Sequence, residues 1–127
     1  MNKLSISPFI IDGQNYLSFN VDDKPVGKCE IVDMGCDNTY QLKSIIIYKK
    51  HRGMQYSTQF WNLVEEWVKN KGGNMITLCA KEDNERFGKL VKLYESWGFC
   101  VDESKKISYV YDGEDLLRKI SMYKLII

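Results

Sequence analysis

The chain has 127 residues and a formal net charge of +1, with 44% hydrophobic and 28% charged residues. These values are ordinary for a single globular domain, here residues 1–127, and they exclude a disordered chain. So small a net charge argues against a broad nucleic-acid-binding surface. No segment approaches the ~20 apolar residues of a membrane-spanning helix, and Met1–Gln14 has one Lys and an apolar segment too short for a secretory signal. We therefore expect neither nucleic acid nor a membrane as a partner.

The cysteines and the single histidine lack the spacing of a metal site. No C-x-x-C pair occurs, and His51 is the only histidine, so the usual ligand sets of structural zinc are missing. Free thiols are typical of a reducing compartment. We therefore expect no metal cofactor and a cytoplasmic protein. The four cysteines are Cys29, Cys36, Cys79 and Cys100.

The first part of the chain predicts antiparallel strands joined by short turns. Runs rich in β-branched and aromatic residues are separated by clusters of Gly, Asp, Asn and Pro, which favour turns. The gaps between these runs leave no room for a helix. The expected strands are Ser7–Asp12, Asn15–Val21 and Val26–Met34.

A fourth strand, Tyr40–Tyr48, leads through a basic loop into a helix. Its apolar run, Ile45–Ile47, predicts a strand buried on both faces. The loop Lys49–Gly53 precedes a helix expected at Ser57–Lys71, whose N-terminus presents free N–H groups and a positive dipole end. This combination predicts a phosphate site. The apolar stripe of the helix is interpreted as core packing, and it comprises Phe60, Trp61, Val64, Trp67 and Val68.

The second half of the chain predicts one further helix among several strands. This helix is expected at Asn84–Trp97, beginning at Asp83 or Asn84 and ending at Gly98 in a left-handed cap. Gly88, placed inside it, is expected to weaken it by ~1 kcal/mol relative to Ala. Its apolar face comprises Phe87, Leu90, Val91, Tyr94 and Trp97. The remaining expected strands are Asn74–Ala80, Phe99–Glu103, Ile107–Tyr111 and Lys119–Ile126.

Two motifs resemble signatures of the GNAT superfamily of N-acyltransferases. R-G-M-Q-Y-S at residues 52–57 is similar to the acyl-CoA loop, Arg/Gln-x-x-Gly-x-Gly/Ala, but Gln55 stands where the family has its central glycine. I-T-L-C-A at residues 76–80, followed by Asn84 and by L-Y-E-S-W-G-F at residues 93–99, resembles the second signature. The resemblance covers roughly residues 26–127 and is stronger in the second signature.

The resemblance implies an α/β (α+β) fold with a mixed, mostly antiparallel sheet of six or seven strands and two main helices. Tyr40–Tyr48 and Asn74–Ala80 would run parallel through a right-handed crossover. The family usually carries one or two helices after its first strand. Here they are expected to be reduced or absent, which would leave the acceptor side open.

The resemblance also implies acetyl-CoA as the acyl donor. In the family, the backbone of the central strand binds the pantetheine arm and polarises the thioester, a role that falls by position to Ile45, Ile46 and Ile47. Lys49, Lys50 and Arg52 could contact the phosphates, or could simply form an exposed basic turn. The other expected cofactor residues are Gly53, Met54, Gln55, Tyr56, Ser57, Thr58 and Asn84.

The resemblance makes Tyr94 the candidate acid that protonates the leaving thiolate, because it matches the Tyr of the second signature. A phenol with a pKa of ~10 stays protonated at neutral pH. The general base is not identified by a motif. Glu30 and Asp33, on the preceding strand, are the nearest carboxylates in sequence, and either could act directly or through a water. Ordinary solvated strand residues are the alternative for both.

Two functions follow from these residues. The first is an acetyl-CoA-dependent N-acetyltransferase that modifies a primary amine, with a protein lysine or N-terminus as a candidate acceptor, by direct attack in a ternary complex. The second is a non-catalytic binding module with the same fold, which Gln55 and the lack of a carboxylate on the central strand favour. A homodimer is a possible assembly for either.

Overall fold

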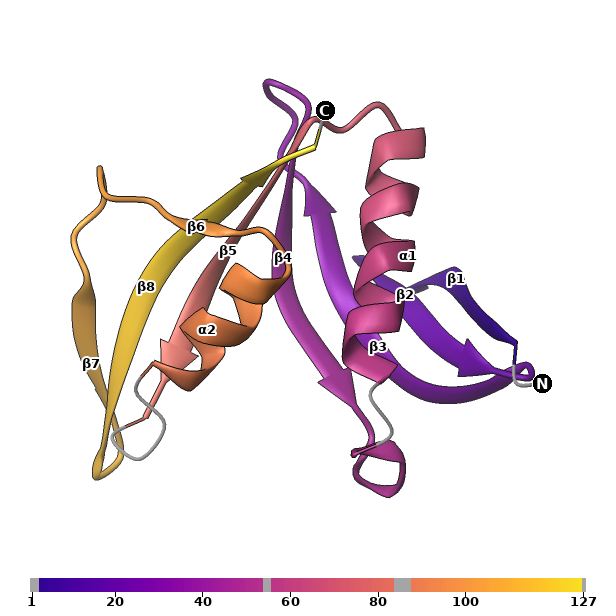
Figure 1. The fold of residues 1–127 in the computed structure, drawn as a ribbon, viewed down its shortest axis with the longest axis horizontal. Helices are drawn as coiled ribbons and strands as arrows, with labels where there is room; N and C mark the ends of the chain where they lie inside the picture. The colour runs from indigo at the N-terminus through magenta and orange to yellow at the C-terminus, as the bar shows by residue number, and fades with distance from the viewer. Residues whose placement is uncertain (1–2, 54–55, 84–87, 127) are drawn as a thin grey trace.

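The computed structural model describes residues 3–53, 56–83 and 88–126 (Figure 1). These residues form one eight-stranded sheet, with strand order β1-β2-β3-β4-β5-β8-β6 and with β7 also paired to β8. Both α-helices lie on the same face of the sheet (Figure 1). The strands are β1 Leu4–Ile11, β2 Gln14–Val21, β3 Lys24–Asp33, β4 Thr39–Ile47, β5 Met75–Glu82, β6 Cys100–Val101, β7 Ser108–Asp112 and β8 Asp115–Leu125. The helices are the short η1 Lys49–His51, α1 Tyr56–Asn70 and α2 Lys89–Ser96.

The sheet is mixed and mostly antiparallel, as predicted, and only β4 and β5 run parallel. It has one strand more than the six or seven expected. The eight strands correspond to the eight ranges expected from the sequence, and the two expected between α2 and β8 are present as the short strands β6 and β7. β6 and β7 pair with successive parts of the same edge of β8. The first expected strand begins earlier than predicted, since β1 starts at Leu4.

No helix separates β1 from β2, as the sequence predicted. The two strands are joined by Asp12 and Gly13, both with positive φ, which is the two-residue hairpin turn that matches strand twist. The described residues therefore place helices on one face only. We call the other side of the sheet the open face. It carries polar side chains at paired positions, such as Ser18 opposite Lys28 and Gln41 opposite Thr77.

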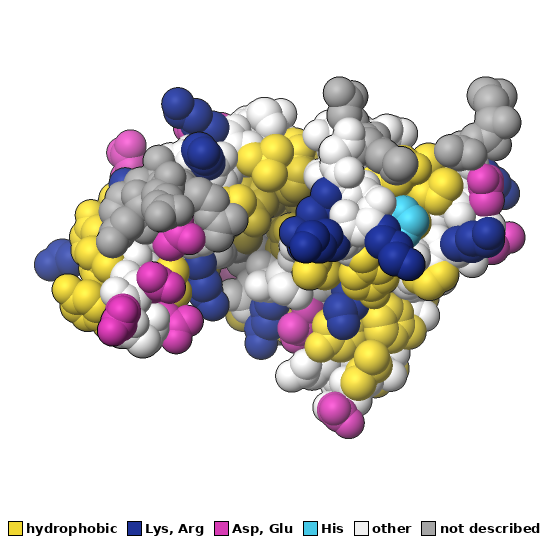
Figure 2. Space-filling view, turned by 90° about the horizontal axis from the view of Figure 1, so that it is seen from below, with side chains coloured by type: hydrophobic (Ala, Val, Ile, Leu, Met, Phe, Trp, Pro, Cys, Tyr) yellow, Lys and Arg dark blue, Asp and Glu magenta, His cyan; other side chains and the backbone are white. Residues whose placement is uncertain are grey.

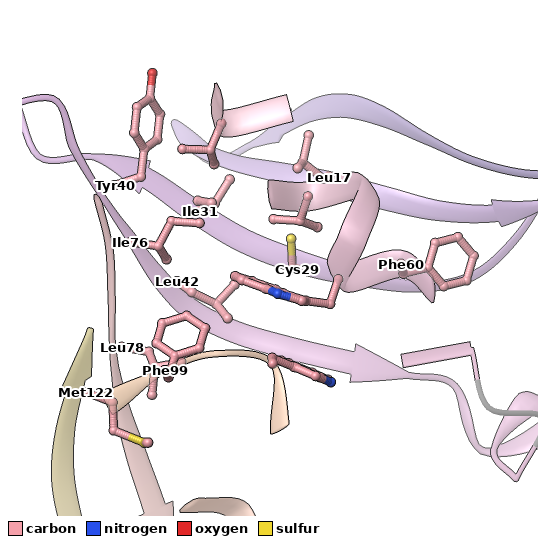
Figure 3. Packing of buried hydrophobic residues seen from close by; sticks show 14 of the residues in the cluster. Leu17, Cys29, Ile31, Tyr40, Leu42, Phe60, Ile76, Leu78, Phe99 and Met122 are labelled. Carbon is pink, nitrogen blue, oxygen red and sulfur yellow. The ribbon is translucent and has the colours of Figure 1, made fainter. Parts of the chain in front are cut away.

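The core lies between the sheet and α1 (Figure 3). Leu17, Cys29 and Ile31 from β2 and β3 meet the apolar stripe of α1, and the Phe60 ring stacks on Phe19 with centroids 4.6 Å apart. The stripe is therefore core packing, as interpreted. Trp67 is its exception, because this side chain is only half-buried. The fully buried stripe residues are Phe60, Trp61, Val64 and Val68.

β4 and β5 pair only at one end and then separate. Their parallel ladder runs from Thr39–Met75 to Leu42–Leu78 and stops there. Beyond it, β4 contains a bulge, since Ile31 pairs with Leu42 while Glu30 pairs with Ser44, and Lys43 is the extra residue. β4 continues along β3, whereas β5 continues along β8 (Figure 1).

The prediction that Ile45–Ile47 is buried on both faces is wrong. Ile46, which pairs with Lys28, is 41% exposed because it lies on the open face, which no described helix covers. Ile45 and Ile47 point to the helix-bearing face and are half-buried, at an end of β4 with which β5 no longer pairs. The well-buried part of the strand is its start, Thr39–Leu42. At the separated end β3 and β4 approach closely, and a Cβ on Gly27 would lie 2.3 Å from the carbonyl oxygen of Ile46.

α2 begins at Lys89, later than predicted. Gly88 stands at the N-cap with φ +91°, so it precedes the helix and does not weaken its interior. The expected first turn, Asn84 to Phe87, lies outside the described residues. The structure therefore confirms a helix here but corrects its predicted start.

The buried carboxylate of Glu82 holds the start of α2. Its Oε2 accepts hydrogen bonds from the N–H groups of Leu90 at 2.7 Å and Val91 at 3.3 Å, and its Oε1 accepts one from Arg118 at 2.9 Å. Burial by itself would raise the pKa of Glu82, but the bonds from Gly88, Arg118, Leu90 and Val91 outweigh it and the pKa is lowered. The carboxylate is thus ionised at the positive end of the helix.

Glu82→Gln tests this anchor through the pH dependence of stability. Because the folded-state pKa is lowered, the carboxylate contributes stability above its unfolded value of about 4.3, and that stability is lost as pH falls through the folded value. We expect the variant to lose about 1.5–3 kcal/mol at pH 7 and the difference from wild type to shrink below about pH 4. Urea unfolding at several pH values measures this. Glu66→Gln, on the exposed side of α1, is the control, and a pH-independent loss at Glu82 would contradict the ionic anchor.

Candidate active site

A cleft opens where β4 and β5 separate, with a volume of about 400 Å³. Its walls come from three parts of the chain: the separated end of β4, the loop and first turn of α1, and one face of α2. It lies on the side of the molecule seen in Figure 2, beside the surface where basic side chains surround the single histidine. The lining residues are Ile45, Ile46, Ile47, Arg52, Ser57, Leu90, Leu93, Tyr94 and Trp97.

The backbone of β4 is the polar element of this largely apolar cleft. An antiparallel strand directs part of its N–H and C=O groups toward each neighbour. From Lys43 to Ile47 β4 has β3 on one side and, among the described residues, no ladder partner on the other. One of these groups is engaged locally, because Arg52 Nε donates to the Ile47 carbonyl at 2.9 Å. Such an edge can pair with an extended chain that carries amide groups.

The basic loop and the start of α1 form the mouth of the cleft. η1 supplies Lys49, Lys50 and His51, and α1 starts one residue earlier than predicted, at Tyr56. The first turn of α1 contains no acidic residue, so no carboxylate of that turn neutralises the positive helix end. The first N–H groups of α1 have no partner within the helix and suit an anion. Met54 and Gln55 lie outside the described residues.

Tyr94 projects from α2 into the cleft. Its ring packs edge-on against Trp97 and Phe99, with centroids 5.5 and 6.1 Å away. Burial raises the pKa of Tyr94 above its usual value, and the negative charge of Glu82 raises it further. The phenol is therefore protonated throughout the neutral range and can donate a hydrogen bond into the cleft.

Trp97 joins α2 to α1 at the floor of the cleft. Its indole stacks on Trp61 at 5.3 Å and 4°, and its Nε1 donates to Thr58 Oγ1 at 3.2 Å. Lys124 Nζ donates to the Trp97 carbonyl at 2.7 Å and to Glu65 at 2.8 Å. Thr58 in the helix start and Tyr94 in α2 are thus held in a fixed relation.

Three lining residues in α2 and at its C-cap were not predicted as site residues: Leu90, Leu93 and Trp97. Two of them, Leu90 and Trp97, had been assigned to the core-facing side of the helix. Together with Tyr94 they have the spacing i, i+3, i+4 and i+7 of one helix face. This spacing was readable in the sequence, but it does not tell a face that packs on a sheet from a face that borders a cleft.

The two candidate carboxylates lie in different places. Glu30 pairs with Ser44, beside the separated end of β4, and alternation directs it to the open face, opposite to Cys29 and Ile31. Asp33 pairs with Tyr40 at the joined end of the strands, and its carboxylate accepts a hydrogen bond from the Gly35 N–H at 2.8 Å. It lines another hollow of about 660 Å³, between the first three strands and α1.

The structure therefore brings six predicted site residues together around the cleft: Ile45, Ile46, Ile47, Arg52, Ser57 and Tyr94. Thr58 is hydrogen-bonded to Trp97 at the floor of the cleft, and Glu30 lies on the adjoining strand β3. The structure does not bring Asp33 to the same place, and Asn84 lies outside the described residues. Among those residues, no group of three or more His, Cys, Asp and Glu could hold a metal ion. No described helix has both the length and the apolar composition to cross a membrane.

Solved acetyltransferases share this fold. The chain is similar to spermidine N-acetyltransferase from Vibrio cholerae, solved with CoA and spermine, at a TM-score of 0.74 and 17% identity over 91% of this chain and 67% of that one. It is also similar to the aminoglycoside 6′-N-acetyltransferase from Enterococcus faecium, with a TM-score of 0.68 and 18% identity over 90% of this chain and 73% of that one. A GNAT-family acetyltransferase from Streptococcus pneumoniae has a TM-score of 0.70 and 20% identity over 92% of this chain and 69% of that one.

At such identities these similarities show the fold alone, and no curated protein matches the sequence. The sequence itself carries the family assignment. Residues 6–99 match the profile of the acetyltransferase (GNAT) family, a span that runs from β1 to the end of the second signature and includes every lining residue of the cleft. The chain therefore belongs to the GNAT acetyltransferase family.

Proposed function

We propose that this protein is an acetyl-CoA-dependent N-acetyltransferase that acetylates a primary amine by direct attack in a ternary complex. The observation that carries the proposal is the separation of β4 from β5, which leaves a strand edge beside a helix N-terminus and opposite Tyr94. Acetyl-CoA is an extended molecule with a pyrophosphate, then two amides, then a thioester. The helix N-terminus suits the pyrophosphate, the strand edge suits the amides, and Tyr94 stands opposite the place for the thioester.

The cofactor would lie along the cleft with its phosphates at the mouth. The pyrophosphate would rest on the N–H groups from Gly53 to Thr58, with Arg52 and the lysines of η1 beside it. The pantetheine amides would pair with the free edge of Ile45 to Ile47 in the manner of an added strand. The apolar side chains of α2 would cover the arm, which excludes water and strengthens these polar contacts.

The reaction would join the amine nitrogen to the thioester carbonyl carbon and break the carbon–sulfur bond. The N–H groups of β4 would stabilise the oxyanion of the tetrahedral intermediate. The Tyr94 hydroxyl would give its proton to the departing thiolate and recover one from solvent. Glu30, on the open face next to Ser44, is the carboxylate whose position supports a role as base through a water. Asp33 is the weaker candidate because it lines the other hollow.

The open face favours a macromolecular acceptor. No described helix covers the sheet on the side of Ser44 and Ile46, so an amine on a protein surface could reach the acetyl group without entering an enclosed pocket. We therefore propose a protein lysine or N-terminus as acceptor. The Vibrio cholerae and Enterococcus faecium proteins act on spermidine and aminoglycosides, which makes small polyamines the comparison substrates.

Cofactor binding is tested by thermal unfolding with acetyl-CoA and dephospho-CoA. Ligand at 100 times its dissociation constant should add ~2.7 kcal/mol of stability, or several degrees in Tm. Dephospho-CoA should bind roughly tenfold more weakly, because it lacks a charge-assisted contact with the basic loop worth about 1.5 kcal/mol.

A matched pair of variants places the binding in the cleft. Leu93→Trp fills the cleft and should abolish the Tm shift, whereas Leu125→Trp, an exposed leucine on another part of the surface, should keep it. A wild-type chain that shows no shift at millimolar acetyl-CoA would contradict the proposal. An equal Tm shift in both variants would mean that the cofactor binds outside this cleft.

Tyr94→Phe tests the chemical step, since it removes the proton donor and keeps the packed ring. Positioned acid catalysis contributes about 10²–10⁴-fold, so kcat should fall by that factor while KM for acetyl-CoA changes only a few-fold. Turnover is measured with lysine peptides, N-terminal peptides and spermidine. If the variant keeps full kcat, a water or another donor, and not Tyr94, protonates the departing thiolate. Cofactor binding without turnover of any amine in the wild type would favour the non-catalytic module.

A further inference from the structure

β7 presents an unpartnered strand edge on the outer side of the sheet. Among the described strands it pairs with β8 alone, and every one of its five residues, from Ser108 to Asp112, is exposed. The exposed side chains are large: Tyr109 is 59% and Tyr111 75% exposed, and Ile107, just before the strand, is 46% exposed. Figure 2 shows hydrophobic side chains along this end of the molecule. A free edge lined by apolar side chains is a template for another strand.

The three apolar side chains lie in one row. Tyr109 pairs with Arg118, whose side chain bonds to Glu82 on the helix-bearing face, so Tyr109 lies on that face too. Alternation puts Tyr111 on the same face, two residues along the strand, and Ile107 joins this row once pairing with a second copy extends the strand back by one residue. Val110 and Ser108 point to the open face.

Charges of opposite sign flank this row. Lys105 and Lys106 precede it, and Asp112 closes the strand, followed by Glu114 in the turn to β8 and Asp115 at the start of β8. Lys105, Lys106 and Asp112 are all exposed. An identical strand laid antiparallel would bring the basic end of each copy against the acidic end of the other. The charge pattern of the segment is therefore complementary to itself in an antiparallel arrangement. This favours a second copy of the chain over a partner of different sequence.

We propose that β7 pairs antiparallel with β7 of a second copy about a twofold axis at Tyr109, so that one sheet continues through the dimer. In this register Tyr109 of one copy faces Tyr109 of the other, and Ile107 faces Tyr111 on the same side. Lys106 faces Asp112 on the open side, twice by symmetry. Aromatic pairs and opposite charges directly across a ladder stabilise it.

The dimer leaves the cleft free. β5 and β8 lie between β7 and the gap beside β4, so the second copy sits two strands away from the lining residues. Assembly and activity are then separable properties. An interface of one short strand from each copy is at the small end for proteins, which predicts a reversible, concentration-dependent dimer.

Sedimentation velocity of the full chain over about 5–500 µM tests the proposal. Wild type should shift from monomer to dimer in this range. Lys106→Glu and Asp112→Lys each place like charges across both symmetric pairs and should raise the dissociation constant at least tenfold. The combined variant restores opposite charges and should return it to within about threefold of wild type. Lys24→Glu, the same charge change at the other end of the sheet, should leave it unchanged.

Tyr109→Lys puts two ammonium groups on the axis and should also abolish the dimer, with far-UV circular dichroism and Tm confirming that the variant folds. A wild type that stays monomeric at 500 µM overturns the proposal. So does a dimer indifferent to Tyr109→Lys, which would mean association through another surface. Failure of the combined variant to restore the dimer overturns the register.

Discussion

The separation of β4 from β5 is the constraint on which the rest of the molecule depends. Past Leu42 the bulge at Lys43 increases the local twist of β4, and the strand stays with β3 while β5 stays with β8. Both strands keep one paired edge, and the sheet acquires an interior edge that none of the described strands fills. Edges of this kind normally invite aggregation. Here α2 covers part of it, and Glu82 fixes α2 in that position through the bonds to its first N–H groups.

Much of the architecture could be predicted from local pattern, because the relevant signals are short-range. The β1–β2 hairpin turn and the stripe of α1 depend on residues a few positions apart, and the structure has both where they were expected, apart from the half-buried Trp67. The errors come from tertiary relations that no local pattern contains. An isoleucine run has the same composition whether one or both faces of its sheet are covered, so the exposure of Ile46 on the open face was not predictable. Gly88 was placed inside a helix because apolar spacing continues through it, whereas in the structure it has a positive φ and stands at the N-cap, before the first residue of α2.

The candidate site divides in the same way. Tyr94 and the loop residues were identified because their neighbours in sequence form a motif, whereas Glu82 has no such context. Its role depends on Arg118, 36 positions later, and on helix N–H groups that the chain positions only after folding. Likewise, Glu30 and Asp33 are three residues apart in sequence yet lie on different faces and beside different hollows. The sequence therefore identified two candidate carboxylates but could not tell which of them lies near the cleft.

The stacked indoles of Trp61 and Trp97 have an optical consequence. Two aromatic chromophores 5.3 Å apart and nearly parallel couple their excited states, so they absorb and emit as a pair and not as independent residues. Trp97 also borders the cleft, and its ring nitrogen is bonded to the helix that forms the mouth. A molecule that enters the cleft therefore comes into contact with one member of the pair. The fold thus carries a built-in spectroscopic reporter at the point where α1 and α2 meet, readable in the unlabelled protein.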